Sequence, residues 1–499
     1  MPLKERLQAA LRRARAFLNP DRPVESSLPD DSASTLEGQK QLIARLLLEE
    51  SGARYAVSYS QEALWFVNRL NPLSGAGNLP VGLRLRGPLD LPVLERSLQE
   101  IITRQSALRT RFELIGTQLC QIVLPKMVMP LVCVDLTDIT EPSREAEAEC
   151  LALKEARVPF DLTQAPLFRA KLLRLGPEHH IFICVMHQTI SDGWSLRVFV
   201  NELLTLYDAF SRGLDSPLEP ISFPFAEYAA WQRETMKSVA ARRQIAYWCQ
   251  KLRGAAGQID LRITPEPAGS ASAEAGSQVV ALPAGLVSGL KRISAEHGAT
   301  LVMVALAAFA VLIWQISASD DILIGLPYAG RSLIETEPVI GNFVNMLLLR
   351  TKLEGDLRFC DLLEKVREST LEALSNSDVP HAKLFEDLDP IRIQVTFSSI
   401  KATAGSQHAG SLSLEPYCIS TGNLLSDLTL YFIEGVNDAW AVEFDYSLGI
   451  FSHERIRRLL SEFLGLLETA AAQPMVALSA LTAQARQSAA VETQSPGIL

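Results

Sequence analysis

The sequence lacks the features of a zinc-binding, disulfide-stabilised or membrane-spanning protein. Its seven cysteines are scattered, and no two of them form a Cys-x-x-Cys pair, so neither a zinc site nor a disulfide framework is indicated. The longest apolar run, Leu301 to Ile313, is too short to cross a bilayer, and we expect it to form a buried helix. No apolar signal core follows Met1. We therefore expect a cytoplasmic protein without membrane association.

An excess of positive charge is also missing. The net charge is -10 at pH 7, which argues against a general nucleic-acid-binding protein because phosphate contacts need concentrated Lys and Arg. A local basic patch for an acidic partner is still compatible with this charge. Hydrophobic residues make up 48% and charged residues 21%, as is typical of globular proteins. A chain of 499 residues is too long for one ordinary core, so we expect two or three domains.

Helix-like and strand-like segments follow one another from residue 57 without a regular βαβ repeat, which favours an α+β fold with a mixed sheet. In the first half we expect helices over 60–70, 91–104, 145–157, 196–210 and 225–250, and strands over 81–86, 109–112, 119–124, 167–175 and 180–186. In the second half we expect helices over 284–297, 301–315, 359–375 and 453–472, and strands over 278–282, 322–326, 345–353, 393–397, 426–433 and 440–446. Two similar halves predict a cleft between them.

The boundaries follow from composition. A stretch rich in Pro, Ala, Gly and Ser at 265–276 separates the halves, which gives an N-terminal lobe over 56–264 and a C-terminal lobe over 277–470. Residues 1–55 are expected to form a leader with two short helices and a linker, either a docking element or a frayed extension. Residues 471–499 are expected to form a flexible tail.

The stretch from Val185 to Ser195 is the best candidate for a reaction centre. An apolar strand that ends in polar residues and glycine, followed by an amphipathic segment, delivers side chains to a strand end, where clefts form. The candidates in this stretch are His187, Gln188 and Asp192.

Six segments, at 58–66, 104–112, 186–195, 225–232, 340–346 and 378–381, resemble in order the motifs of one family. They include Ser-Tyr-Ser-Gln-Glu-Ala-Leu-Trp-Phe, Met-His-Gln-Thr-Ile-Ser-Asp-Gly and Gly-Asn-Phe-Val-Asn. The chain resembles, over roughly residues 57–467, the condensation domain of nonribosomal peptide synthetases, in the chloramphenicol-acetyltransferase-like superfamily.

The resemblance implies two similar lobes in a V shape around a central tunnel. Donor and acceptor carrier proteins would present substrates there on phosphopantetheine arms, so that the chain itself carries no covalent cofactor and no metal. The implied reaction is acyl transfer from a carrier-bound acyl or peptidyl thioester to an amine or a hydroxyl. We expect a monomer.

The resemblance also assigns roles to residues. His187 would be a buried structural imidazole, Asp192 an ion-pair partner of Arg331, and Gly193 a backbone contributor to oxyanion stabilisation. Trp194, Ser195 and Asn345 are candidates for substrate binding, although core packing is an alternative for Trp194.

The sequence departs from the family at the second His of the core motif, which is usually assigned as catalytic and is Gln188 here. A Gln side chain cannot take up a proton near pH 7. Gln105 likewise stands where the second motif commonly has His. Three hypotheses follow: a condensation-type acyltransferase with a natural or engineered change at Gln188, a non-catalytic module that binds carriers or recruits an enzyme, and an acyltransferase that uses coenzyme A.

Overall fold

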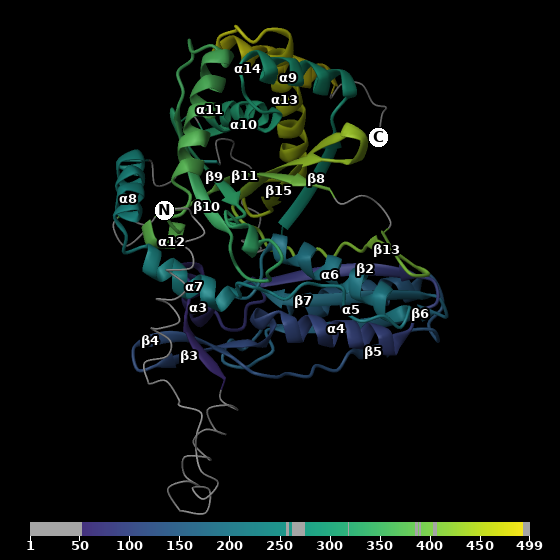
Figure 1. Ribbon diagram of the computed structural model, residues 1–499. Helices are drawn as coiled ribbons and strands as arrows, with labels where there is room; N and C mark the ends of the chain where they lie inside the picture. Colours follow the sequence, from purple (N-terminus) through teal and green to yellow (C-terminus); the bar gives the residue numbers. More distant parts are fainter. Residues whose placement is uncertain are drawn as a thin grey trace, which may run out of the picture. The chain divides into compact units, whose positions relative to one another are not determined.

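The computed structural model describes residues 52–255, 259–261, 275–317, 319–384, 388, 391–402 and 407–492. The expected leader helices, and nearly all of the expected boundary segment 265–276, lie outside these residues. The chain divides into two compact units, coloured by sequence in Figure 1. The first unit takes in the described residues up to Arg242 together with 329–344 and 407–421, and the second unit takes in the rest. The units are therefore discontinuous in sequence, unlike the contiguous lobes that composition predicted.

A six-stranded sheet forms the centre of the first unit. Its strands, in spatial order, are β12 (Gln407–Ala409), β13 (Leu412–Pro416), β2 (Asn78–Arg86), β7 (His179–His187), β6 (Phe168–Gly176) and β5 (Val132–Asp135). All neighbours are antiparallel except β5 and β6, which makes the sheet mixed, as predicted. A smaller sheet contains β1 (Ala53–Ala56), β4 (Gln118–Val123) and β3 (Thr110–Ile115), of which β3 and β4 form the expected hairpin.

The helices of the first unit are α3 (Tyr59–Leu70), α4 (Leu91–Arg104), α5 (Ser143–Arg157), α6 (Gly193–Ser211) and α7 (Phe225–Thr235), with 3₁₀ turns η2 (Ser106–Arg109) and η3 (Ile334–Thr336). Helix α5 packs on β2 and β7, and α4 packs against α6. Strand β7 is buried from His180 to His187, which explains its continuous apolar run, since a strand covered on both faces does not alternate.

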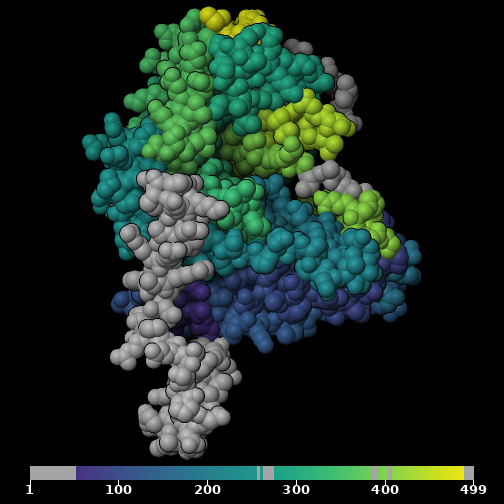
Figure 2. Space-filling model, in the orientation of Figure 1, coloured from purple at the N-terminus to yellow at the C-terminus, as the bar shows by residue number. Residues whose placement is uncertain are grey.

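Two strands of the first unit come from residues far along the chain. Strand β13 pairs with β2, with Ser413 opposite Arg86, and β12 extends this hairpin. Figure 2 shows this yellow-green segment against the blue surface of the N-terminal residues. These strands were not predicted from the sequence, because they are short and pair with a strand more than 300 residues away.

The second unit contains a six-stranded sheet and a group of helices that pack around α10. The sheet order is β10 (Asn345–Lys352), β9 (Asp321–Tyr328), β11 (Val395–Lys401), β14 (Leu428–Glu434), β15 (Trp440–Ser447) and β8 (Ala275–Ala281). The helices are α9 (Ala284–Glu296), α10 (Leu301–Ser317), α11 (Phe359–Ser375), α12 (His381–Leu384), α13 (His453–Ala472) and α14 (Leu478–Glu492), with the 3₁₀ turn η4 (Val436–Asp438).

Helix α10 is almost entirely buried and contacts α9, α11, α13 and α14, which confirms the prediction of a buried core helix. Among the described residues, no single helix has the length and apolar composition needed to cross a membrane. Helices α9 and α10 meet these two criteria only when they are counted together, and the chain bends by 101° between them.

Two predictions of local structure were wrong. The helix expected over 225–250 is two helices, because the chain turns at Met236 and restarts as α8 (Val239–Leu252), which spans the division between the units. The tail expected to be flexible from residue 471 contains α14, whose Leu478 and Leu481 side chains are buried against the second unit. Helix α14 approaches α13 closely at Gly465, where a Cβ atom would lie 3.1 Å from the Ala485 carbonyl oxygen.

Candidate functional site

The predicted reaction centre lies between the end of β7 at His187 and the start of α6 at Gly193. Asp192 is the N-cap of α6, and its Oδ1 accepts a hydrogen bond from the Ser195 N–H at 2.7 Å. An acidic N-cap side chain satisfies a helix N–H that has no partner within the helix. The loop between His187 and Gly193, here called the motif loop, is therefore fixed to the first turn of α6.

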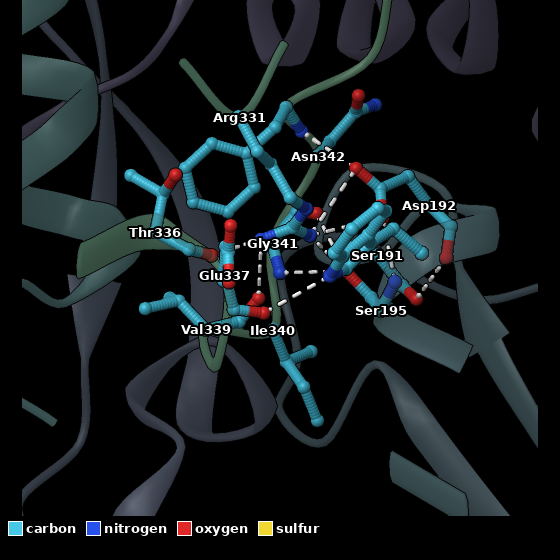
Figure 3. Close-up of polar contacts among 12 residues, drawn as sticks. Ser191, Asp192, Ser195, Arg331, Thr336, Glu337, Val339, Ile340, Gly341 and Asn342 are labelled. Carbon is cyan, nitrogen blue, oxygen red and sulfur yellow. Dashed lines mark hydrogen bonds and ion pairs between the residues drawn. The ribbon is translucent and has the colours of Figure 1, made fainter. Parts of the chain in front are cut away.

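A buried ion pair joins this loop to residues 329–344 (Figure 3). Arg331 Nη2 lies 3.1 Å from Asp192 Oδ1, and the two side chains are only 2% and 4% exposed. Asp192 Oδ2 also accepts the Phe343 N–H at 3.0 Å. Burial lowers the pKa of Arg331, and the charge of Asp192 opposes this effect. The structure thus brings together the two residues that the resemblance pairs.

Ser195 occupies the middle of this network. Its Oγ lies 2.7 Å from Asp192 Oδ1 and 2.8 Å from the Gly341 carbonyl oxygen, and it accepts hydrogen bonds from Gly341 N–H and Arg331 Nη2, both at 3.0 Å. A Cβ atom at Gly341 would lie 2.1 Å from the Phe225 ring, so only glycine allows this approach. The Ser195 hydroxyl is committed to holding the site together, a role other than the substrate binding expected for it.

The rest of the Arg331 guanidinium holds the segment that follows it. Its Nη1 donates to the carbonyl oxygens of Thr336 and, at 2.8 Å, Val339. The guanidinium carbon also lies 4.1 Å from the centre of the Phe343 ring. One buried cation therefore fixes the fold of residues 331–343 as well as the start of α6.

Both main-chain polar groups of Gln188 are hydrogen-bonded. Its N–H donates to the Gly77 carbonyl oxygen at 2.7 Å, and its carbonyl oxygen accepts the Asn342 side-chain amide at 2.7 Å. Asn345 was the residue predicted from this motif, whereas Asn342, three residues earlier, was missed. Asn345 belongs to the second unit, where its side chain binds the Ser377 and Val379 carbonyl oxygens.

His187 is unsuited to act as a base in place of Gln188. Its Nδ1 accepts the Thr189 N–H at 3.2 Å and lies 2.8 Å from Thr189 Oγ1, so the neutral ring carries its proton on Nε2. A Cβ atom at Gly77 would lie 2.5 Å from that Nε2. Burial, and to a smaller extent the charge of Arg169, lowers the pKa of His187 to about 4. The imidazole is neutral and enclosed near pH 7, and its unprotonated Nδ1 is already hydrogen-bonded to Thr189.

Gly193 and Trp194 begin α6 and are more accessible. Gly193 is exposed, with no atom within 4 Å of the position that a Cβ would take, and the N–H of a first helical residue has no partner within the helix. Trp194 Nε1 donates to the Glu337 carbonyl oxygen at 3.0 Å, and the Arg197 guanidinium lies over its ring. In the described part of the chain, no group of three or more His, Cys, Asp or Glu side chains could hold a metal ion.

Gln105, which stands where the resemblance leads us to expect His, ties three elements together. Its Nε2 donates to Glu202 Oε1 and to the Pro338 carbonyl oxygen, and its Oε1 accepts the Ile340 N–H, all at 2.9 Å. The side chain is 1% exposed. A neutral imidazole has only one donor and one acceptor, so it could not make all three bonds.

Fold and motif together define a two-unit α+β protein with the scaffold His-x-x-x-x-Asp-Gly at the start of a helix. The chain belongs to the condensation-domain family, whose model matches residues 52–490. It is 35% identical over 472 residues to a linear gramicidin synthase protein of Brevibacillus parabrevis, a match that covers 92% of this chain and 6% of that protein. The chain thus spans a small fraction of this relative's length.

Solved structures support the same assignment. The X-domain in its complex with OxyB from teicoplanin biosynthesis superposes with a TM-score of 0.76 at 25% identity, over 86% of this chain and 95% of that one. The first condensation domain of the calcium-dependent antibiotic synthetase, in complex with a substrate analogue, superposes with a TM-score of 0.72 at 21% identity, over 86% and 98%. The second likeness concerns the fold alone.

The ion pair predicts strong coupling between Asp192 and Arg331. Asp192→Ala should lower the free energy of unfolding by about 3–5 kcal/mol, because it leaves Arg331 buried without its counter-charge. Arg331→Met should also destabilise, and the double variant should lose clearly less than the sum of the two losses. Urea denaturation measures all three. Glu234→Ala, which breaks the exposed pair with Lys237, is the matched control and should cost less than about 1 kcal/mol. Additive losses would contradict the coupling.

His187 predicts a pH-dependent stability. Because its folded pKa of about 4 lies below the unfolded value near 6.5, its contribution is present above pH 6.5 and is lost as the pH falls towards 4. At pH 5 the loss should be about 2 kcal/mol for this group alone. His187→Gln should reduce the fall in unfolding free energy between pH 7.5 and 5, measured by urea denaturation at each pH. His408→Gln, at an exposed position, should leave the fall unchanged, and an equal fall in both variants would refute the assignment.

Gln105→His should destabilise the protein even though it introduces the residue that the resemblance leads us to expect there. One of the three buried partners loses its hydrogen bond, at a cost of about 1–3 kcal/mol. Thermal unfolding should show a lower melting temperature than for Gln118→His, the same exchange at an exposed position. A melting temperature equal to that of the control would show that the three bonds matter little.

Proposed function

We propose that the chain is a condensation-type acyltransferase that transfers an acyl or peptidyl group from a carrier-bound thioester to the amine of a second carrier-bound substrate. Membership of the condensation-domain family supports the reaction class. The observation that carries the proposal is the retained scaffold: the buried Asp192–Arg331 pair holds the start of α6 and Gln188 stays anchored through Gly77 and Asn342.

The residue at position 188 favours an amine over a hydroxyl as the acceptor. An α-amino group with a pKa near 8 is partly neutral at cellular pH, so it needs no protein base to become nucleophilic. A hydroxyl is far less acidic and would need one. The Gln188 side-chain oxygen can accept a hydrogen bond from the amine N–H and so orient the nitrogen lone pair. The product would be an amide.

The proposed acyl transfer needs no cofactor bound to this chain. The amine nitrogen attacks the thioester carbonyl carbon, the carbon–sulfur bond breaks, and the amine proton leaves to solvent or to the departing thiolate of the donor arm. Gly193 is an exposed residue at the positive end of the α6 dipole, and its N–H is the donor that we assign to the oxyanion. Both phosphopantetheine arms come from partner carrier proteins.

A non-catalytic recruitment module is the second candidate. It is favoured by the likeness to the X-domain that was solved with OxyB and by the absence of a base at Gln188. In this role the fold would present a surface to another enzyme, and the motif would serve only stability.

A transfer assay with loaded donor and acceptor carrier proteins separates the candidates. We expect amide formation by the unchanged chain, with a rate that follows the ionisation of the acceptor amine. Gln188→His should raise the rate at least tenfold near pH 7, because a general base typically contributes about 10²–10⁴-fold, and should shift the profile towards lower pH. Gln188→Asn, a shorter amide, is the matched control and should be slower than the unchanged chain.

Product from neither the unchanged chain nor Gln188→His, despite measurable carrier binding, would favour the recruitment module. A free coenzyme A thioester used as fast as the carrier-bound donor would instead support the third hypothesis, an acyltransferase that uses coenzyme A.

A further inference from the structure

We propose that the first unit contains a second binding site, for a small organic cation that carries a primary ammonium group on an apolar body. The site is a pocket of about 550 Å³, which is within the usual range for small-molecule sites. Its walls come from α4, α6, residues 218–220 and residues 334–338, all in the first unit. Gln188 is not part of the lining, so the inference does not depend on the proposed acyl transfer.

The buried residue Glu202 is one of the lining residues of this pocket. Glu202 on α6 is only 5% exposed. Its Oε1 accepts hydrogen bonds from Arg104 Nε and Gln105 Nε2, each at 2.9 Å, whereas its Oε2 has no hydrogen-bond partner among the described residues. A buried acceptor without a donor destabilises the protein, so a ligand that brings a donor to Oε2 relieves that penalty.

The charges around Glu202 favour a cation over an anion. The pocket is lined by the carboxylates of Glu202, Glu219 and Glu337 but by only two guanidinium groups. One of these, Arg104, is already paired with Glu202, and the other, Arg197, lies 4.6 Å from the centre of the Trp194 ring. An anionic ligand would place a further negative charge near a carboxylate that burial already disfavours.

The pocket also offers apolar surface at its rim. Leu218 and Val198 are among its lining residues, and Ile334 contributes a side chain that is 74% exposed. An alkyl chain of about six carbons bound there would remove apolar surface from water, which favours binding. A ligand that combines an ammonium group with such a chain matches both parts of the pocket.

Titration calorimetry of the full chain with three probes of equal length tests the proposal. n-Hexylamine should bind, 1-hexanol should bind at least tenfold more weakly because it offers one neutral donor, and hexanoate should not bind detectably. Equal affinities for hexylamine and hexanol, or no binding of hexylamine at millimolar concentration, would overturn the proposal.

Two variants locate the site. Glu202→Gln should weaken hexylamine binding at least tenfold and leave hexanol binding nearly unchanged. Because this change also alters the contact with Arg104, Ile334→Lys provides an independent test: it places a positive charge at the exposed rim and should weaken hexylamine binding without touching the buried network. Leu114→Lys, at an exposed position on β3, is the matched control. Hexylamine affinity unchanged in both Glu202→Gln and Ile334→Lys, with folding verified by circular dichroism, would overturn the assignment.

Discussion

The ion pair between Asp192 and Arg331 is the interaction on which the rest of the first unit depends. Removing two charges from water is costly, and the attraction between them repays this only when their remaining hydrogen-bonding groups are satisfied. Here the Ser195 hydroxyl, the Phe343 N–H and the carbonyl oxygens near Val339 provide most of those bonds, although Arg331 Nε has no hydrogen-bond partner among the described residues. The pair therefore specifies one arrangement of the motif loop, the first turn of α6 and residues 331–343.

Within this short motif, the side chains of some residues hold the structure, whereas the side chain of another residue does not. Asp192 and His187 are buried and committed to protein contacts, so their identities are dictated by packing. Gln188 differs because its main chain carries the structural contacts, through Gly77 and Asn342. These main-chain contacts do not require a particular side chain at position 188, so a glutamine can make them.

Much of the fold could be predicted from sequence where local signals agree. Helix α4 begins and ends as expected because Asp90 caps its first turn and its apolar residues recur on one face, and Ser452 does the same for α13. Strand β7 was evident from its apolar run. The break after Met236 was missed because the aromatic residues on both sides continue a helical pattern. Helix α14 was missed because, apart from Leu478, Leu481 and Val491, its apolar residues are all alanines.

The candidate site was predictable only in part. Asp192, Arg331 and Gly193 follow from a motif, but Asn342 and Thr189 act through hydrogen bonds that no periodicity in the sequence indicates. The same holds for β13, whose pairing with β2 depends on residues that lie far apart in the chain. Non-local contacts of this kind become visible only when the folded chain brings the two segments together.

The discontinuity of the first unit also sets an order of events during synthesis. Asp192 precedes Arg331 by 139 residues, and translation at about 5–20 residues per second adds them in roughly 7 to 28 seconds. During that interval Asp192 has no counter-charge from Arg331. Strand β13, which pairs with the edge of β2, is synthesised later still. The N-terminal residues therefore leave the ribosome unable to complete their own core, and they reach their final stability only after most of the second unit has been made.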